Sequence, residues 1–172
     1  MEAVIGFSVA LIAAENGWLL SGRDPRIVAA SLLGLLLLCA LAFAGHGVLS
    51  VATLLGLSLF SLCHFQLLAR TLRPTRVRTS LAFAFGLVHG FGFAGVLAEM
   101  SLPTSRLAPA LFGFNLGVEV GQLAVVALAW PLLQLARRLS EGRWYRLTSQ
   151  IASAAICGLG LYWFILRTFA EG

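Results

Sequence analysis

Long apolar segments separated by short arginine-containing stretches dominate this sequence. A helix needs about 20 mostly apolar residues to cross a membrane, and six segments meet that need: residues 3–20, 27–44, 48–69, 81–99, 107–136 and 147–166. Hydrophobic residues make up 59% of the chain and charged residues only 11%, whereas an average soluble domain has about 25% charged residues. The pattern predicts an integral membrane protein, an all-α polytopic bundle of six transmembrane helices in a single domain, residues 1–172.

The arginines are distributed unevenly between the two sides that six crossings define. All 12 basic residues are arginine, and ten of them lie in or beside the loops at 21–26, 70–80 and 137–146. These loops fall on one side of the membrane, and an excess of positive charge is typical of cytoplasmic loops. We therefore expect these loops inside and both termini outside.

Several classes of protein are excluded by motif and spacing. The net charge of +5 comes from these loop arginines, so it does not indicate a nucleic-acid partner. Cys39, Cys63 and Cys157 stand alone in separate apolar segments without CxxC spacing, which predicts packing residues rather than disulfides or a zinc site. The sequence has no Walker A, HExxH or GxSxG motif, so neither an ATP-driven pump nor an intramembrane hydrolase has motif support.

The fifth segment carries a line of polar residues through an otherwise apolar helix. Asn115, Glu119 and Gln122 are spaced by four and three residues, so they share one narrow helix face. A charged group inside the bilayer costs at least about 2.5–3.5 kcal/mol on insertion scales, and such groups usually face the bundle interior. We therefore expect a functional stripe. The alternative is interhelical hydrogen bonding, which contributes about 0.6 kcal/mol per contact.

The fourth segment places a histidine beside small residues. Gly86 and Gly90 form a GxxxG motif, and His89 borders its face. Small residues let a second helix approach closely, so this helix is expected to present His89 to a neighbour. The alternative is a packing histidine with a backbone partner.

Four further polar positions are candidates. Glu15 is expected to line the same metal or proton path from an adjoining helix, and the weaker candidates are Asn16, His64 and His46. Glu15 and its neighbour Asn16 lie in the first segment, either inside the bundle or at the inner interface. His64 lies in the third segment and either joins the site or faces the headgroups. His46 lies in the tight reversal Gly45–Gly47 and is expected at the outer surface, as a solvated residue or as the first ligand that a metal meets.

Imidazole, carboxylate and amide groups together form a mixed nitrogen and oxygen donor set. Such a set suits Ni, Co, Zn or Cu better than Ca or Mg, and it would also serve as a proton relay. The donors come from different segments, so spacing in the sequence leaves both interpretations open.

The sequence resembles the C-terminal half of the HupE/UreJ family in three stretches: AFAFGLVHGFGFAGVLAEM, LFGFNLGVEVGQLAVVALAWPL, and RWYR followed by SQIASAAICGLGLYW. The opening EAVIGFSVALIAAEN is similar to the helix that precedes these motifs. The resemblance covers residues 80–167 and, less closely, 1–20, whereas 27–69 resembles no part of the family pattern. The family's early histidine-rich Asp-His metal motif has no counterpart here.

The resemblance implies a multi-pass protein of the bacterial inner membrane that is associated with hydrogenase or urease maturation. It further implies a nickel or cobalt permease, passive or proton-coupled, or a metal-handling accessory protein, rather than an enzyme. No tightly bound cofactor is expected, and the expected partners are the lipid bilayer and a divalent metal ion, with a homo-oligomer or a membrane partner left open.

Residues of this sequence match the family motifs position by position: His89, Asn115, Glu119 and Gln122 in the later stretches, and Glu15 and Asn16 in the opening one. His89 and Glu119 are the expected central ligands or proton carriers. Two alternatives are a non-transporting assembly partner and an intramembrane enzyme that uses His89 and Glu119 as acid and base.

Overall fold

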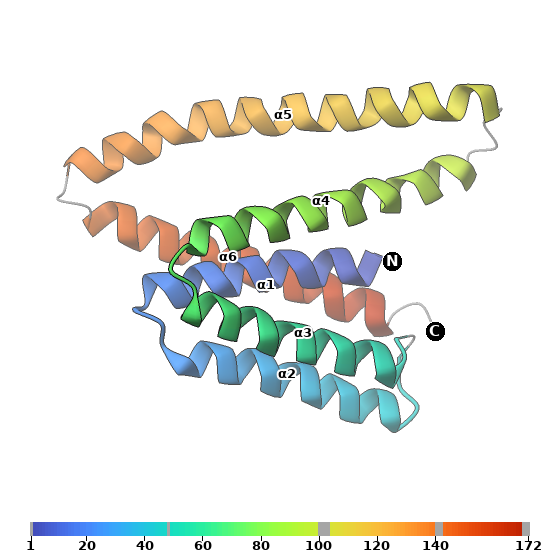
Figure 1. Cartoon of the computed structure of the whole chain (residues 1–172), viewed down its shortest axis with the longest axis horizontal. Helices are drawn as coiled ribbons and strands as arrows, with labels where there is room; N and C mark the ends of the chain where they lie inside the picture. Colours follow the sequence, from blue (N-terminus) through green and yellow to red (C-terminus); the bar gives the residue numbers. More distant parts are fainter. Residues whose placement is uncertain (1, 48, 100–103, 140–142, 170–172) are drawn as a thin grey trace. The chain divides into compact units, whose positions relative to one another are not determined.

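The computed structural model describes residues 2–47, 49–99, 104–139 and 143–169. In these residues the chain forms six α-helices and no strand (Figure 1), which confirms the predicted all-α fold. The helices are α1 Glu2–Leu20, α2 Pro25–Phe43, α3 Val51–Arg70, α4 Pro74–Glu99, α5 Thr104–Leu139 and α6 Arg143–Phe169.

Within the described residues, five helices are long and apolar enough to cross a membrane: α1, α2, α3, α5 and α6. The predicted fourth span corresponds to α4. The structure describes the backbone of this helix to Glu99 but its side chains only to Gly90. The predicted orientation, with both termini outside, stays a prediction.

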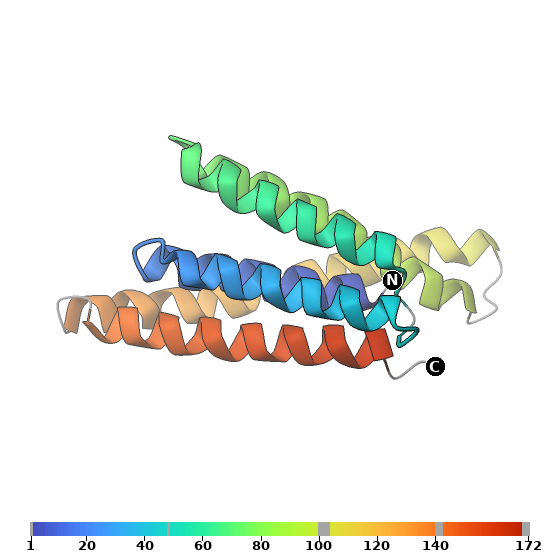
Figure 2. The same cartoon turned by 90° about the horizontal axis from the view of Figure 1, so that it is seen from below.

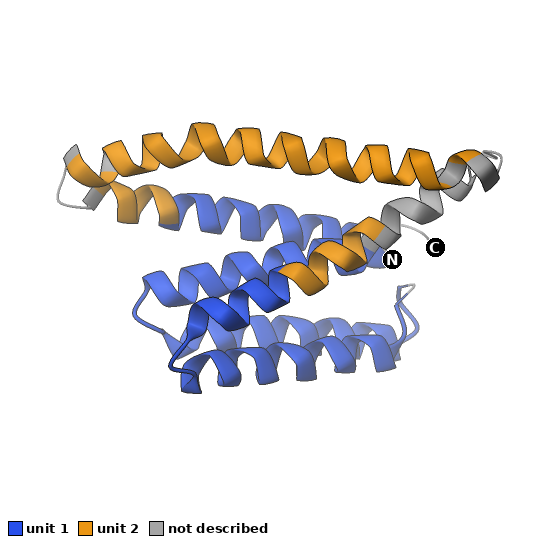
Figure 3. Ribbon diagram, turned by 45° about the horizontal axis from the view of Figure 1, so that its top comes forward, with its two compact units in different colours: residues 1–82, 150–172 blue, residues 83–149 orange. Residues whose placement is uncertain are grey.

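The chain divides into two compact units (Figure 3). Unit 1 comprises residues 1–82 and 150–172, and so holds α1, α2, α3, the first turns of α4 and most of α6. Unit 2 comprises residues 83–149, which include the rest of α4 and all of α5. Each unit is described by itself below.

Local capping sets the limits of α2. Asp24 precedes Pro25, and its carboxylate accepts a hydrogen bond from the backbone N–H of Arg26 at 2.9 Å. Such a cap satisfies one of the free N–H groups at a helix start, and proline fits the first helical position because its missing N–H is not needed there. At the other end Gly45 adopts a φ of +85°, and the backbone N–H of His46 donates to Leu41 at 3.1 Å. This glycine-dependent ending is the reversal that the sequence predicts.

The loop expected at 70–80 is shorter than the sequence suggests. Helix α4 begins at Pro74, seven residues before the predicted 81, because proline again serves as a first helical residue. Arg76 and Arg78 therefore belong to the first two turns of α4 and not to a loop. Helix α5 is likewise longer than the predicted 107–136 and includes both Pro109 and Pro131.

Helices α1 and α6 pack with their backbones in direct contact within unit 1 (Figures 1 and 2). A Cβ atom on Gly160 of α6 would lie 2.6 Å from the backbone nitrogen of Ala10, and a Cβ on Gly6 of α1 would lie 2.7 Å from the nitrogen of Phe164. Small residues permit this approach, as is typical of helices packed in membranes. The contact fixes α1, which carries Glu15 and Asn16, against α6.

Candidate functional site

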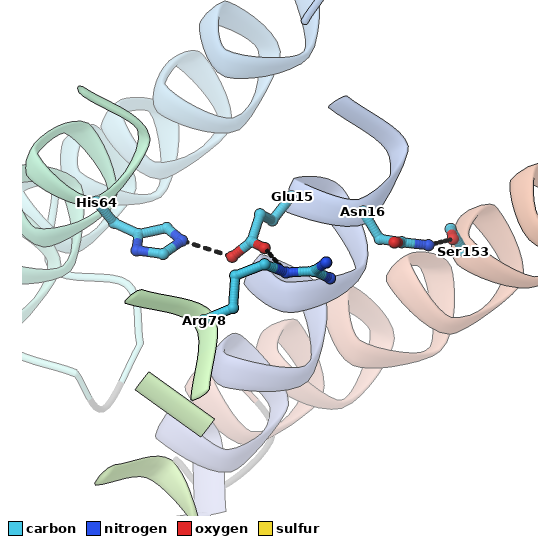
Figure 4. Close-up of polar contacts among 5 residues, drawn as sticks. All are labelled: Glu15, Asn16, His64, Arg78 and Ser153. Carbon is cyan, nitrogen blue, oxygen red and sulfur yellow. Dashed lines mark hydrogen bonds and ion pairs between the residues drawn. The ribbon is translucent and has the colours of Figure 1, made fainter. Parts of the chain in front are cut away.

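Among the described residues of unit 1, the most buried charged group is Glu15, near the end of α1. Its Oε2 atom lies 2.6 Å from Nε2 of His64 on α3, and its Oε1 atom forms an ion pair with Nε of Arg78 on α4 (Figure 4). The side chains of Glu15 and His64 are 2% and 4% exposed, whereas that of Arg78 is 39% exposed. Three helices therefore each contribute one ionisable side chain to the same point.

The two carboxylate oxygens of Glu15 have different partners. An ionised carboxylate only accepts hydrogen bonds, so Nε2 of His64 carries the proton in the contact with Oε2. Oε1 is shielded from solvent, and its charged partner is Arg78. Each oxygen of the carboxylate therefore has its own partner on a different helix.

Aromatic side chains fix the imidazole of His64. The ring of Phe60 stacks on it with the planes 9° apart and the centroids 6.3 Å apart, and Phe65 lies at 5.8 Å with a tilted ring. Phe65 in turn packs edge-on against Trp18 of α1 at 5.7 Å. The aromatic contacts hold the imidazole in one orientation and keep water away from its bond with Glu15.

Asn16 points away from Glu15 to the opposite side of α1 (Figure 4). Its Nδ2 atom donates to Oγ of Ser153 on α6 at 2.6 Å. Ser153 lies seven residues, or about two helical turns, before Gly160, so the hydrogen bond shares the α1–α6 contact with the glycines. The hydrogen bond between Asn16 and Ser153 therefore links α1 to α6.

The predicted residues of unit 2 lie on α4 and α5. The two helices approach at Gly90, where a Cβ atom would lie 3.5 Å from Oδ1 of Asn115, while a Cβ on Gly86 would meet nothing within 4 Å. The close contact is therefore at Gly90, directly beside His89 in the sequence. Glu119 continues the same face of α5.

The side chains of Asn115, Glu119 and Gln122 are all exposed in the single chain. Nδ2 of Asn115 donates to the backbone oxygen of Leu111 at 2.9 Å. The expectation that Glu119 and His89 form one site stays a prediction, as does the participation of Glu15, which belongs to unit 1.

Within the described residues, no three His, Cys, Asp or Glu side chains gather as a metal site would require. The nearest approach to such a group is Glu15 with His64, a carboxylate and an imidazole in contact. His46 lies apart from both, exposed in the turn after α2.

The sequence arguments missed Arg78 and Ser153. Arg78 was assigned only to the positive-inside pattern, because the helix was expected to begin after it. A usable signal was nevertheless present: Glu15 and His64 each lie five residues before the end of segments that finish on the same side, 3–20 and 48–69. Equal depth from one surface predicts that two such side chains can meet.

Comparison with known proteins identifies one family. The family model described as HupE / UreJ protein matches residues 36–167, well over half of the chain. No curated protein and no solved structure gives a significant match.

The limits of this match differ from the expected ones. It includes α3 and the C-terminal part of α2, so the expectation that 27–69 lies outside the family pattern is wrong from residue 36 onward. The opening segment, 1–20, lies outside the match, and its resemblance stays a prediction. With its long apolar helices and this match across most of its length, the chain belongs to the HupE/UreJ family.

Proposed function

We propose that this chain is a membrane permease, or a metal-handling accessory protein, for a divalent transition metal, with nickel or cobalt favoured. The family is in general one of nickel and cobalt transport or accessory proteins rather than enzymes. Passage is passive or proton-coupled, because no nucleotide-binding motif occurs in the sequence.

The observation that carries this proposal is the approach of α4 to the polar face of α5. The contact at Gly90 brings the helix of His89 against Asn115, one turn from Glu119. In the proposed mechanism Glu119 and His89 supply the oxygen and nitrogen donors, a combination that suits nickel and cobalt. Asn115 and Gln122 orient these donors by hydrogen bonds, as residues around a metal site commonly do.

Uptake of nickel and cobalt by cells with and without the chain tests the proposal. Expression should raise uptake of at least one metal, and Glu119→Gln should remove the increase while the protein stays folded in the membrane. Val120→Ala is the matched control, because Val120 neighbours Glu119 but is exposed off the polar face. It should transport normally.

Two results would contradict the proposal in different ways. If uptake is the same with and without the chain and the purified protein holds no metal, the chain is a non-transporting assembly partner whose polar face only joins helices. Normal uptake by Glu119→Gln would remove Glu119 as an essential ligand or proton carrier while leaving transport intact.

A further inference from the structure

Exposed arginines gather at one end of unit 1, where α1 and α3 end and α2 and α4 begin (Figure 1). These arginines, here called the arginine rim, are Arg23, Arg26, Arg70, Arg73 and Arg76. Nη1 of Arg23 donates to the backbone oxygen of Ala69 at 3.2 Å, so the turn after α1 contacts the end of α3. Residues 3–82 contain two acids, and both have partners: Asp24 caps α2 and Glu15 pairs with Arg78. The rim therefore carries a net positive charge.

Leu72 lies in this rim between Arg70 and Arg73, and it is 98% exposed in the single chain. An apolar side chain flanked by arginines suits the boundary between hydrocarbon and headgroups, where it enters the apolar layer while the guanidinium groups stay at the phosphates. This pattern indicates that the rim lies at the level of the lipid headgroups.

A partly open cavity of about 300 Å³ lies beside the rim, between α1 and the first turns of α4. The polar part of its lining consists of Glu15, Thr75, Arg78 and Thr79. The apolar part consists of Ile12, Leu81 and Ala82. Counted from the end of α1 and the start of α4, the polar residues lie within about 8 Å of the rim and the apolar ones about 10–12 Å from it. The lining thus changes from polar to apolar with depth, as a phospholipid does from its phosphate to its acyl chains.

The close contact with Glu15 fixes Arg78 at the polar end of this cavity. The contact engages Nε of Arg78, and the terminal nitrogens of a guanidinium carry four further N–H groups. A guanidinium held in one orientation is well suited to phosphate, because its N–H groups match phosphate oxygens in pairs. Thr75 and Thr79 are four residues apart on α4, so their hydroxyl groups share one helix face and add two donors. The oxygen of Glu15 that pairs with Arg78 is shielded from solvent, so the positive rim dominates the attraction for an anion.

We propose that this cavity binds the phosphate of an anionic glycerophospholipid such as phosphatidylglycerol, with Arg78, Thr75 and Thr79 as donors and an acyl chain along the apolar lining. The rim favours an anionic over a zwitterionic headgroup, because each basic residue near a membrane surface strengthens the attraction to anionic lipid. A lipid in this position contacts both α1 and α4. The proposal does not depend on the proposed function, since lipid binding is measured without metal.

Native mass spectrometry of the purified full-length chain tests the site. Titration with phosphatidylglycerol and, separately, phosphatidylcholine measures the affinity for the first lipid bound. The wild type should bind phosphatidylglycerol about fivefold or more tightly than phosphatidylcholine. Equal affinity for the two lipids would overturn the proposal and would leave the rim as a surface for a protein partner.

Two variants change the cavity without changing its charge. Thr75→Val/Thr79→Val removes the hydroxyl donors at nearly constant volume, and should weaken phosphatidylglycerol binding about fivefold or more, because hydrogen bonds to charged groups are stronger than neutral ones. Ala82→Phe fills the apolar end of the cavity and should weaken binding by a similar factor or more. Unchanged affinity in both variants would mean that the rim attracts lipid diffusely, and would overturn the site.

Each variant has a matched control on α4. Ser80→Ala removes a hydroxyl group from an exposed residue beside Thr79, and Ala84→Phe adds the same ring two residues beyond Ala82; neither residue lines the cavity. Both should bind phosphatidylglycerol as the wild type does. An equal loss of binding in the controls and in the cavity variants would contradict the assigned position.

Inorganic phosphate distinguishes a lipid from a soluble anion. Millimolar phosphate should leave phosphatidylglycerol binding unchanged, and displacement of the lipid by phosphate would assign the site to the free anion and overturn the lipid assignment. A phosphatidylglycerol with a photoreactive acyl chain covers the case in which the variants do not fold. In nanodiscs it should label the wild-type chain at Ile12 or at Leu81 and Ala82, and labelling confined to other helices would refute the proposal.

Discussion

Gly160→Ala tests whether the α1–α6 backbone contact holds the Glu15 helix in place. The added Cβ would lie 2.6 Å from the nitrogen of Ala10, 3.0 Å from its Cα and 3.0 Å from the oxygen of Gly6. All three atoms are backbone, so no side chain can rotate away. Since favourable contacts need about 3.5–4.0 Å, the two helices must separate by about 1 Å.

The cost follows from this separation. Overpacking of a tight contact typically destabilises by about 1–3 kcal/mol. A shift of about 1 Å would also stretch the 2.6 Å bond between Asn16 and Ser153 beyond hydrogen-bond length. Alanine at an open helix position does the opposite, since it stabilises by roughly 0.5–1 kcal/mol relative to glycine.

Gly158→Ala is the matched control on the same helix, because a Cβ on Gly158 would meet nothing within 4 Å. Thermal unfolding of both variants in detergent should move in opposite directions. A change of 1 kcal/mol corresponds to about 2–4 °C in Tm for a chain of this size, so Gly160→Ala should melt several degrees below the wild type and Gly158→Ala slightly above it. A Gly160→Ala protein as stable as Gly158→Ala would refute the described α1–α6 contact.

Three further predictions concern topology, the helix end and the polar face of α5. Reporter fusions after Arg73 and after Phe169 should report opposite compartments, cytoplasmic and external, because arginine-rich loops stay inside; the same compartment for both would contradict the predicted orientation. Gly45→Ala should destabilise by about 1–2 kcal/mol in thermal unfolding, because a φ of +85° is strained for any residue with a Cβ; an unchanged Tm would contradict the left-handed helix ending. Glu119→Gln should unfold at the same temperature as the wild type or higher, because it removes the cost of placing a charge in the membrane; a large loss of stability would indicate that the charge stabilises the fold. His89→Ala should lose metal uptake as Glu119→Gln does.

The helices could be predicted from the sequence because their cause is local. A bilayer offers no partners for free backbone N–H and C=O groups, so long apolar stretches must satisfy them internally as helices. Pro25 after Asp24, and Gly45 before His46, mark helix ends through capping that involves only near neighbours. The start of α4 was misplaced because Arg76 and Arg78 interrupt the apolar pattern, although they do not interrupt the helix.

The candidate polar residues inside the helices could also be identified from the sequence, because a charge is costly in an apolar segment. Glu15 and His64 were both identified in this way, but not as partners. Their equal depth in the two segments permits the contact, but the contact itself depends on α1 and α3 packing side by side, which the sequence does not determine.

Only the tertiary structure showed that Arg78 pairs with Glu15. By sequence it was one more arginine in a positively charged stretch, and the positive-inside pattern accounted for it fully. The early start of α4 turns this side chain toward the end of α1, where a buried carboxylate needs a counter-charge. The sequence thus determined which groups are costly in a membrane, and packing decided which of them meet. The cost of a charge in an apolar segment follows from the residue itself, whereas burial and pairing depend on the distances between helices.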